Sequence, residues 1–101
     1  MVRSKPKKAR SAKVPKKIED MLEEIHEMND QALFPTGYER AVIGYVERFG
    51  MDPLVLVDKE KMLEMMVADG MTYEESLEFY EFNIIGAWVG DGTPCFATLI
   101  K

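Results

Sequence analysis

Apolar side chains recur at helical spacing in residues 15–30, where acidic side chains fill most of the other positions. Side chains three and four residues apart lie on one side of a helix, so this pattern predicts an amphipathic helix over 15–30. Pro15 suits its first turn, because the fixed φ of proline matches helical backbone. The apolar positions are Ile18, Met21, Leu22, Ile25 and Met28.

A second helix is expected near 59–69. Asp58 stands at an N-cap position before a group of apolar residues, and Gly70 follows them as a natural stop. Met65 and Met66 lie in the middle of this segment. Their flexible thioethers are expected to fill irregular gaps in the core.

A third helix is expected to begin at Thr72. Thr72 and Glu75 have the spacing of a capping box, in which each side chain bonds the backbone amide of the other residue. The helix should end at Asn83 or Gly86. Its main apolar side consists of Tyr73, Leu77, Tyr80 and Ile84.

Two runs of β-branched residues, 41–46 and 54–57, predict strands. Gly50 and Pro53 lie between them and favour a turn, so the two strands should pair in antiparallel orientation. Further extended segments are expected at 88–89 and 95–100, on either side of a turn at 90–94.

These elements predict an α+β fold in one domain, residues 15–101, with a small antiparallel sheet packed against helices. The expected order is helix, two strands, two helices, and then one or two strands. A proline and a glycine break the helical pattern in the loop 33–37, where Leu33 and Phe34 should anchor the connection in the core.

Charge divides the chain into two parts. The first 17 residues carry eight of the 13 Lys and Arg residues and none of the 18 Asp and Glu residues, so their formal charge is +8 and that of the other 84 residues is −13. Residues 1–14 also lack apolar periodicity, which predicts a disordered basic arm. The basic residues are Arg3, Lys5, Lys7, Lys8, Arg10, Lys13, Lys16 and Lys17.

Two interpretations of this basic arm stay open. In the first, its cations neutralise the phosphates of a nucleic acid or nucleoprotein, without sequence preference because the arm has no aromatic side chain to stack on bases. In the second, the arm keeps the protein in solution or folds against its own acidic first helix. A membrane is not an expected partner, because the arm carries no apolar anchor or lipidation signal.

The composition predicts a cytoplasmic protein that folds without a disulfide, metal or cofactor. Hydrophobic residues make up 47% of the chain, enough to build one core. The single cysteine, Cys95, fits a reducing compartment. No apolar stretch approaches the length of a membrane span, and no signal-peptide apolar region follows the basic residues.

Reaction motifs are scarce. His26 is the only histidine, which excludes an internal two-histidine metal site. Glu23 and His26 have the spacing used in di-metal helical bundles, but those sites need a second such pair and further inward glutamates. The glycine-rich segment 90–93 lacks the lysine of a phosphate-binding loop. We therefore expect no catalytic residue, no metal site and no enzyme activity.

Acidic residues follow the outer side of the third expected helix. Glu74, Glu78 and Glu81 fit a solvated surface, a cation site, or a surface that imitates nucleic acid and occupies a basic site on another protein. Trp88 follows this helix, and its exposure would favour a homodimer or another protein contact. These four residues are the candidate protein contacts.

Five short stretches resemble a family of small hypothetical proteins from bacteria and their phages. The resemblance covers residues 38–96 and leaves out the basic arm and the first helix. It implies that 38–96 form one unit and that the protein has an accessory role in a phage or prophage, and it names no catalytic residue. The stretches are residues 38–44, 57–61, 69–76, 82–87 and 90–94.

Two function hypotheses follow from the sequence. The first is a non-enzymatic accessory protein whose basic arm contacts nucleic acid or nucleoprotein while the acidic domain makes a protein contact. The alternative is an acidic inhibitor or nucleic-acid mimic that occupies a basic surface on a host protein.

Overall fold

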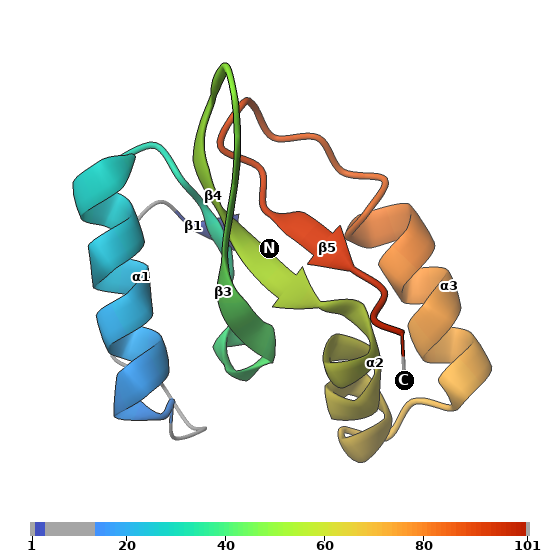
Figure 1. The fold of residues 1–101 in the computed structure, drawn as a ribbon. Coiled ribbons are helices and arrows are strands. Elements are labelled where there is room, and N and C mark those ends of the chain that lie inside the picture. Colours follow the sequence, from blue (N-terminus) through green and yellow to red (C-terminus); the bar gives the residue numbers. More distant parts are fainter. Residues whose placement is uncertain (1, 4–13, 101) are drawn as a thin grey trace.

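The computed structural model describes residues 2–3 and 14–100. These residues form three helices and a three-stranded sheet in one α+β unit, as the sequence predicts (Figure 1). The order of the elements also matches the prediction. The helices are α1 (Lys16–Met28), α2 (Lys59–Ala68) and α3 (Tyr73–Asn83), and the strands of the sheet are β3 (Val42–Arg48), β4 (Met51–Asp58) and β5 (Cys95–Ala97).

Helix α1 lies along one side of the sheet and contacts β3 and β4 (Figure 1). Leu22 and Ile25 are buried in the core, and Ile18 and Met21 pack against it, as their spacing predicts. The helix ends at Met28, after which the backbone becomes extended. The apolar side of α1 therefore packs against the sheet, while its opposite side faces solvent.

Strands β3 and β4 form an antiparallel hairpin that is longer than the sequence indicates. Its loop contains only Phe49 and Gly50, and the φ of Gly50 is +82°, a conformation that favours glycine. Pro53 lies within β4, where the register shifts between the pairs Val46–Leu54 and Arg48–Met51. Proline is tolerated in strands at edges and bulges, and this part of β4 has no β5 partner.

Strand β5 pairs with β4 in parallel orientation, with Cys95 opposite Leu56. The sheet is therefore mixed, not wholly antiparallel as expected. Helix α3 explains the difference, because it carries the chain back along the sheet before β5 begins, and β5 then runs in the same direction as β4 (Figure 1).

The segment 84–94 is irregular, so the strand expected at 88–89 does not form. The turn near Gly90 consequently joins no hairpin. Instead, the chain packs against the connection that follows α1, and the amide of Leu33 donates a hydrogen bond to the carbonyl of Gly92 at 2.9 Å. At the far end, strand structure stops at Ala97 rather than near residue 100. A docked loop takes the place of an extra strand.

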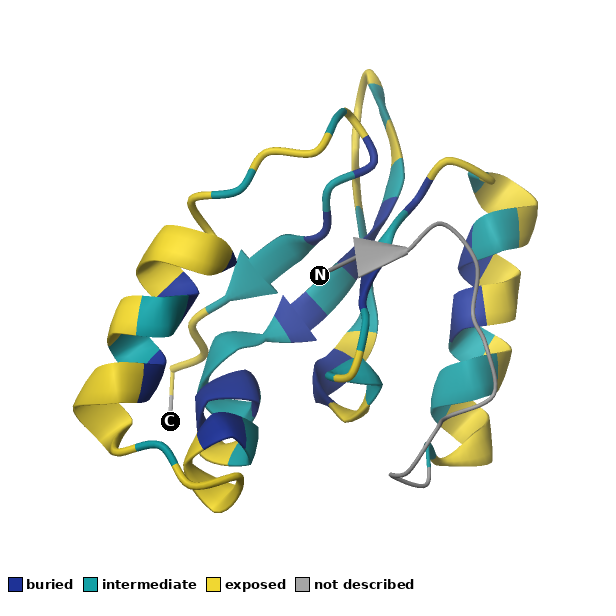
Figure 2. Ribbon diagram, turned by 180° about the vertical axis from the view of Figure 1, so that it is seen from behind, coloured by how far each residue is buried: buried dark blue, intermediate teal, exposed yellow. Residues whose placement is uncertain are grey.

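The core lies between α1, one face of the sheet, and helices α2 and α3 (Figure 2). Phe34 and the α2 residues Met62, Leu63 and Met66 are fully buried. The predictions that Phe34 anchors its loop and that Met66 fills the core are confirmed, while Met65 packs at the edge of the core. These methionines fill the space where a short helix meets twisted strands.

The capping box at the start of α3 is present as predicted. Thr72 Oγ1 accepts a hydrogen bond from the amide of Glu75 at 3.1 Å, and Glu75 Oε1 accepts one from the amide of Thr72 at 2.9 Å. Each bond satisfies an amide that has no partner within the helix. Helix α3 ends at Asn83, one of the two predicted ends.

Thr72→Ala should lower the free energy of unfolding by about 1 kcal/mol, because it removes the hydroxyl that accepts from Glu75. Urea denaturation followed by circular dichroism measures the change. Thr98→Ala is the matched control, since Thr98 is exposed outside any helix or strand. Equal loss in both variants would contradict a specific contribution of the cap.

The N-terminal cations lie mostly outside the described residues. Val2–Arg3 form a short strand, β1, that pairs in antiparallel orientation with β2, Phe34–Pro35. The sequence did not indicate this pairing. The prediction of a disordered arm otherwise falls on residues 4–13, which the structure does not describe.

Candidate functional site

The two predicted cations inside the described helix region lie at the exposed start of α1. Lys16 Nζ is 3.1 Å from Asp20 Oδ1, and the hydrogen bond and charge of Asp20 raise the pKa of Lys16. Lys17 is also exposed. Arg3 belongs to β1, while the other five predicted cations, Lys5, Lys7, Lys8, Arg10 and Lys13, lie outside the described residues.

The three predicted acidic contacts, Glu74, Glu78 and Glu81, are all exposed along α3. Within residues 14–100, none of them forms an ion pair with a Lys or Arg side chain. Glu75 differs, because its carboxylate is bonded within the capping box. Burial, and secondarily the charge of Glu81, raise the pKa of Tyr80 on the same helix. Within the part of the chain that the structure describes, the carboxylates of Glu74, Glu78 and Glu81 therefore have no cationic partner.

Trp88 is 72% exposed and belongs to a group of apolar side chains that continues from the end of α3. Phe82 is 75% exposed, Ile85 52% and Val89 49%. Exposed apolar groups this close together on a small domain are typical of interaction surfaces. The structure thus gives Trp88 the exposure that a protein contact requires.

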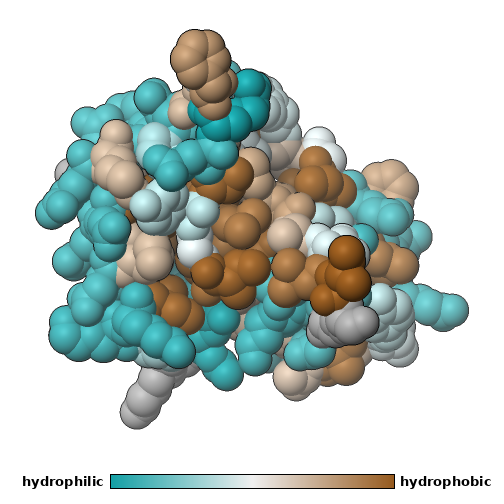
Figure 3. Space-filling model, in the orientation of Figure 1, coloured by the Kyte–Doolittle hydropathy of each residue, from teal (hydrophilic) through white to brown (hydrophobic). Residues whose placement is uncertain are grey.

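The outer face of the sheet is also apolar. The register places Val46 beside Leu54 and Leu56 beside Cys95, and these four side chains share the face opposite the core residues Val55 and Val57. An antiparallel pair with one face in water usually carries polar residues on that face. Figure 3 shows apolar surface gathered over the sheet in the centre of the view.

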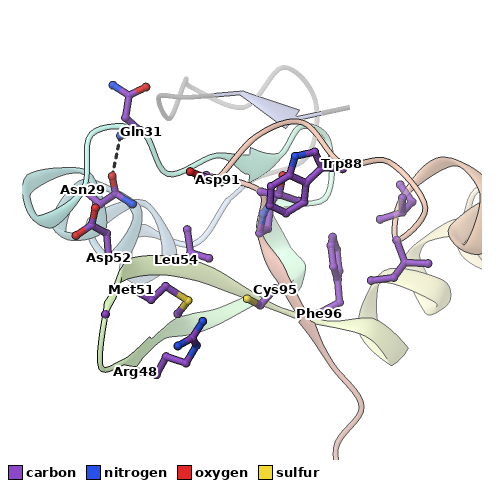
Figure 4. Close-up of a pocket in the computed structure, with 16 residues that line it drawn as sticks. Asn29, Gln31, Arg48, Met51, Asp52, Leu54, Trp88, Asp91, Cys95 and Phe96 are labelled. Atoms are coloured by element: carbon purple, nitrogen blue, oxygen red, sulfur yellow. Dashed lines mark hydrogen bonds between the residues drawn. The ribbon is translucent and has the colours of Figure 1, made fainter.

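A groove of about 860 Å³ opens at the edge of β4. Its lining comes from both faces of the sheet, because Leu54 lies on the outer face whereas Ile84 and Phe96 pack with the core. Strand β5 begins only opposite Leu56, so the first part of β4 extends beyond it. One wall of the groove comes from this part of β4, and the other from the segment 84–94 (Figure 4). The apolar lining residues are Met51, Leu54, Ile84, Ile85, Trp88 and Phe96.

The rim of the groove carries opposite charges on exposed side chains. Asp52 lies on β4 and Asp91 on the wall that carries Trp88, whereas Arg48 lies on the hairpin (Figure 4). The guanidinium of Arg48 donates to the carbonyl of Phe49 at 3.2 Å. Neither aspartate forms an ion pair within residues 14–100. Their two carboxylates are open to a ligand.

A smaller pocket of about 160 Å³ lies along the same segment. It shares Ile84, Thr93, Pro94 and Phe96 with the groove and adds Pro35 and Val89. The segment 84–94 therefore borders two hollows, and its residues Ile84, Thr93 and Pro94 line both.

His26 links α1 to the connection that follows it. Its Nε2 lies 2.7 Å from the carbonyl oxygen of Ala32, which can only accept, so Nε2 carries the proton. Its Nδ1 is buried and has no hydrogen-bond partner among the described residues. Within residues 2–3 and 14–100, no group of three or more His, Cys, Asp and Glu side chains is arranged to hold a metal ion. The His26 ring instead fixes the turn that follows α1.

The sequence did not indicate the groove. Its walls come from the β3–β4 hairpin and from residues 84–94, which meet only because β5 is short and parallel. Only Trp88 among its lining residues was a predicted contact. The apolar residues of β4 could be assigned to a strand from their sequence, but a strand pattern does not tell which face lacks a covering helix.

No helix in the described part of the chain has the length and apolar character needed to cross a membrane. Comparison of the chain with protein-family models, with curated proteins and with solved structures gives no match.

Proposed function

We propose that the protein is a non-enzymatic accessory protein of the cytoplasm that joins a protein partner to nucleic acid or nucleoprotein. The observation that carries this proposal is the group of exposed apolar side chains around Trp88, on a domain whose charge is opposite to that of the N-terminal segment. The apolar surface supports a protein contact. The cations before α1 support a separate contact with phosphates.

The nucleic-acid contact predicts a steep dependence on salt. Replacing Lys5, Lys7, Lys8, Arg10 and Lys13 by glutamine should weaken binding to duplex DNA and make the slope of log K against log salt shallower by up to about 4.5, since each lost phosphate contact removes about 0.9. This variant keeps Val2–Arg3, whose pairing with Phe34–Pro35 a truncation would destroy.

Fluorescence anisotropy with labelled duplex DNA and single-stranded RNA, over a series of salt concentrations, measures this dependence. The matched control replaces Lys59 and Lys61 of α2 by glutamine, and it should leave the slope unchanged. An unchanged slope after neutralisation of the N-terminal cations would contradict the nucleic-acid contact.

A second candidate function is supported by the free carboxylates of Glu74, Glu78 and Glu81. An acidic inhibitor or nucleic-acid mimic would use these three side chains to occupy a basic protein surface. Such a protein would lose its target when all three become glutamine, and would keep it when the N-terminal cations are neutralised. The accessory protein should show the reverse dependence for nucleic acid.

We also propose that this accessory role belongs to a phage or prophage. The support is the resemblance of residues 38–96 to small phage and bacterial proteins. Expression of the chain during prophage induction, compared with uninduced cells of the same strain, tests this part separately.

A further inference from the structure

We infer that the groove between β4 and the segment 84–94 binds a segment of a partner protein in which bulky apolar side chains lie between lysines or arginines. This inference rests on the protein contact in the proposed function and names its site and the chemistry of the partner. Three properties of the groove lead to it: its apolar lining, its strand edge interrupted by a proline, and the two aspartates on its walls.

The lining selects apolar side chains. Leu54 is 8% exposed at the base of the groove, and Met51, Ile84 and Phe96 surround it. Trp88 stands at the wall with most of its ring accessible (Figure 4). A flat aromatic ring beside a flexible methionine offers a large contact area at small entropic cost, which is typical of residues that dominate protein interfaces.

The edge of β4 inside the groove does not favour the pairing of an additional strand. Pro53 has no amide hydrogen, and its carbonyl already accepts a hydrogen bond from Asn29 Nδ2 at 2.9 Å. Natural sheets use proline in this way to protect an edge. A partner therefore binds here by inserting side chains and not by extending the sheet.

The charges select a basic partner. Asp52 and Asp91 lie on opposite walls and have no ion-pair partner within residues 14–100. Arg48 is the one cation among the lining residues, and it is bonded to its own hairpin. The rest of the domain strengthens this selection, because residues 18–101 carry a formal charge of −13.

The basic N-terminal segment of the same chain does not meet these requirements. Residues 4–13 supply cations, but their only apolar residues are Pro6, Ala9 and Ala12. These side chains are too small to fill a groove built around Trp88 and Leu54. The chemistry therefore favours a different protein over the chain's own segment.

Three synthetic peptides test this inference. The first has a central Leu-Phe-Leu with two lysines on each side, the second replaces the lysines by glutamates, and the third replaces the centre by three serines. Trp88 is the only tryptophan, so its emission reports directly on the groove. Only the first peptide should shift this emission to shorter wavelength in a saturable way.

Variants of the groove locate the binding. With the first peptide fluorescently labelled, anisotropy should show about tenfold weaker binding for Trp88→Ala and for the double variant Asp52→Asn with Asp91→Asn. Phe49→Ala and Asp69→Asn are the matched controls, because both residues are exposed and neither lines the groove. They should change the affinity by less than about twofold. All four proteins should show the same urea midpoint.

Several outcomes would overturn the inference: equal binding of all three peptides, equal binding by groove and control variants, or preference for the glutamate peptide. A concentration-dependent shift of Trp88 emission without peptide, together with dimers in sedimentation equilibrium, would assign the groove to a second copy of the chain instead. Each result is independent of the nucleic-acid contact, since the peptide titrations use protein in which the five N-terminal cations are neutralised.

Discussion

Phe34→Ala should lower the free energy of unfolding by about 4 kcal/mol. Phe34 is fully buried, and its ring meets the His26 ring edge to face, with centroids 6.5 Å apart. Removing the ring leaves a cavity between α1 and the sheet, and it also removes support from the His26 contact with Ala32. Because a domain of this size is stable by only about 5–15 kcal/mol, much of the stability depends on this one side chain.

Urea denaturation measures this loss, and an unchanged m value would show that the unfolded state is not altered. Phe49→Ala is the matched control, because the same side chain is removed from the fully exposed tip of the β3–β4 hairpin. Its effect should stay within about 0.5 kcal/mol. A loss below about 1 kcal/mol for Phe34→Ala would contradict its place in the core.

Gly92→Ala should destabilise the domain by about 3 kcal/mol, from overpacking and the weakening of one hydrogen bond. A Cβ atom at residue 92 would overlap the backbone carbonyl of Gln31. Backbone atoms cannot turn aside as a flexible side chain can, so the segment 84–94 has to move away from the connection after α1. The bond from the amide of Leu33 to the carbonyl of Gly92 then lengthens or breaks.

Gly90→Ala is the comparison that distinguishes a steric clash at residue 92 from the backbone strain of replacing a glycine. Gly90 has a φ of +109°, and a Cβ there would meet no atom within 4 Å. Its replacement should therefore cost about 1–2 kcal/mol, from backbone strain alone. Thermal or urea unfolding of both variants gives the comparison, and an equal loss would show that the contact with Gln31 does not limit the packing of the segment.

Local signals in the sequence predict the helices well. The apolar spacing before Met28, the N-cap at Asp58 and the capping box at Thr72 each act within a few residues, and the helices begin at or within one residue of the predicted positions. The strands of the hairpin were also located, although Pro53 was assigned to a turn. A proline inside a strand is tolerated at an unpaired edge or a bulge, and local sequence does not reveal where these lie.

The direction of β5 could not be predicted in the same way. Residues 88–89 and 95–100 have strand-like composition around a glycine-rich turn, and such a pattern normally predicts a hairpin. In the structure, Gly92 is required for its small size, because the turn packs against Gln31. The predicted strand at 88–89 was wrong because these glycines were interpreted as a turn between neighbouring strands, whereas Gly92 packs against a distant segment.

Local sequence likewise predicts only part of the candidate site, and tertiary packing determines the rest. Exposure of Glu74, Glu78 and Glu81 follows from helical spacing. The exposure of Trp88 depends on how the segment 84–94 packs, which the sequence leaves open. The groove depends on where β5 begins relative to β4, which is a property of the tertiary arrangement. The apolar character of Leu54 and Leu56 in sequence fits a buried strand equally well.

The parallel pairing of β5 also determines how the domain opens. Its three residues reach β4 only after the chain has closed a long loop through α2 and α3, and loop closure costs entropy that so short a strand repays poorly. The hairpin of β3 and β4 needs no such loop. We therefore expect amide hydrogen exchange to show β5 opening at a lower free energy than β3 and β4, and such an opening should widen the groove beside Trp88.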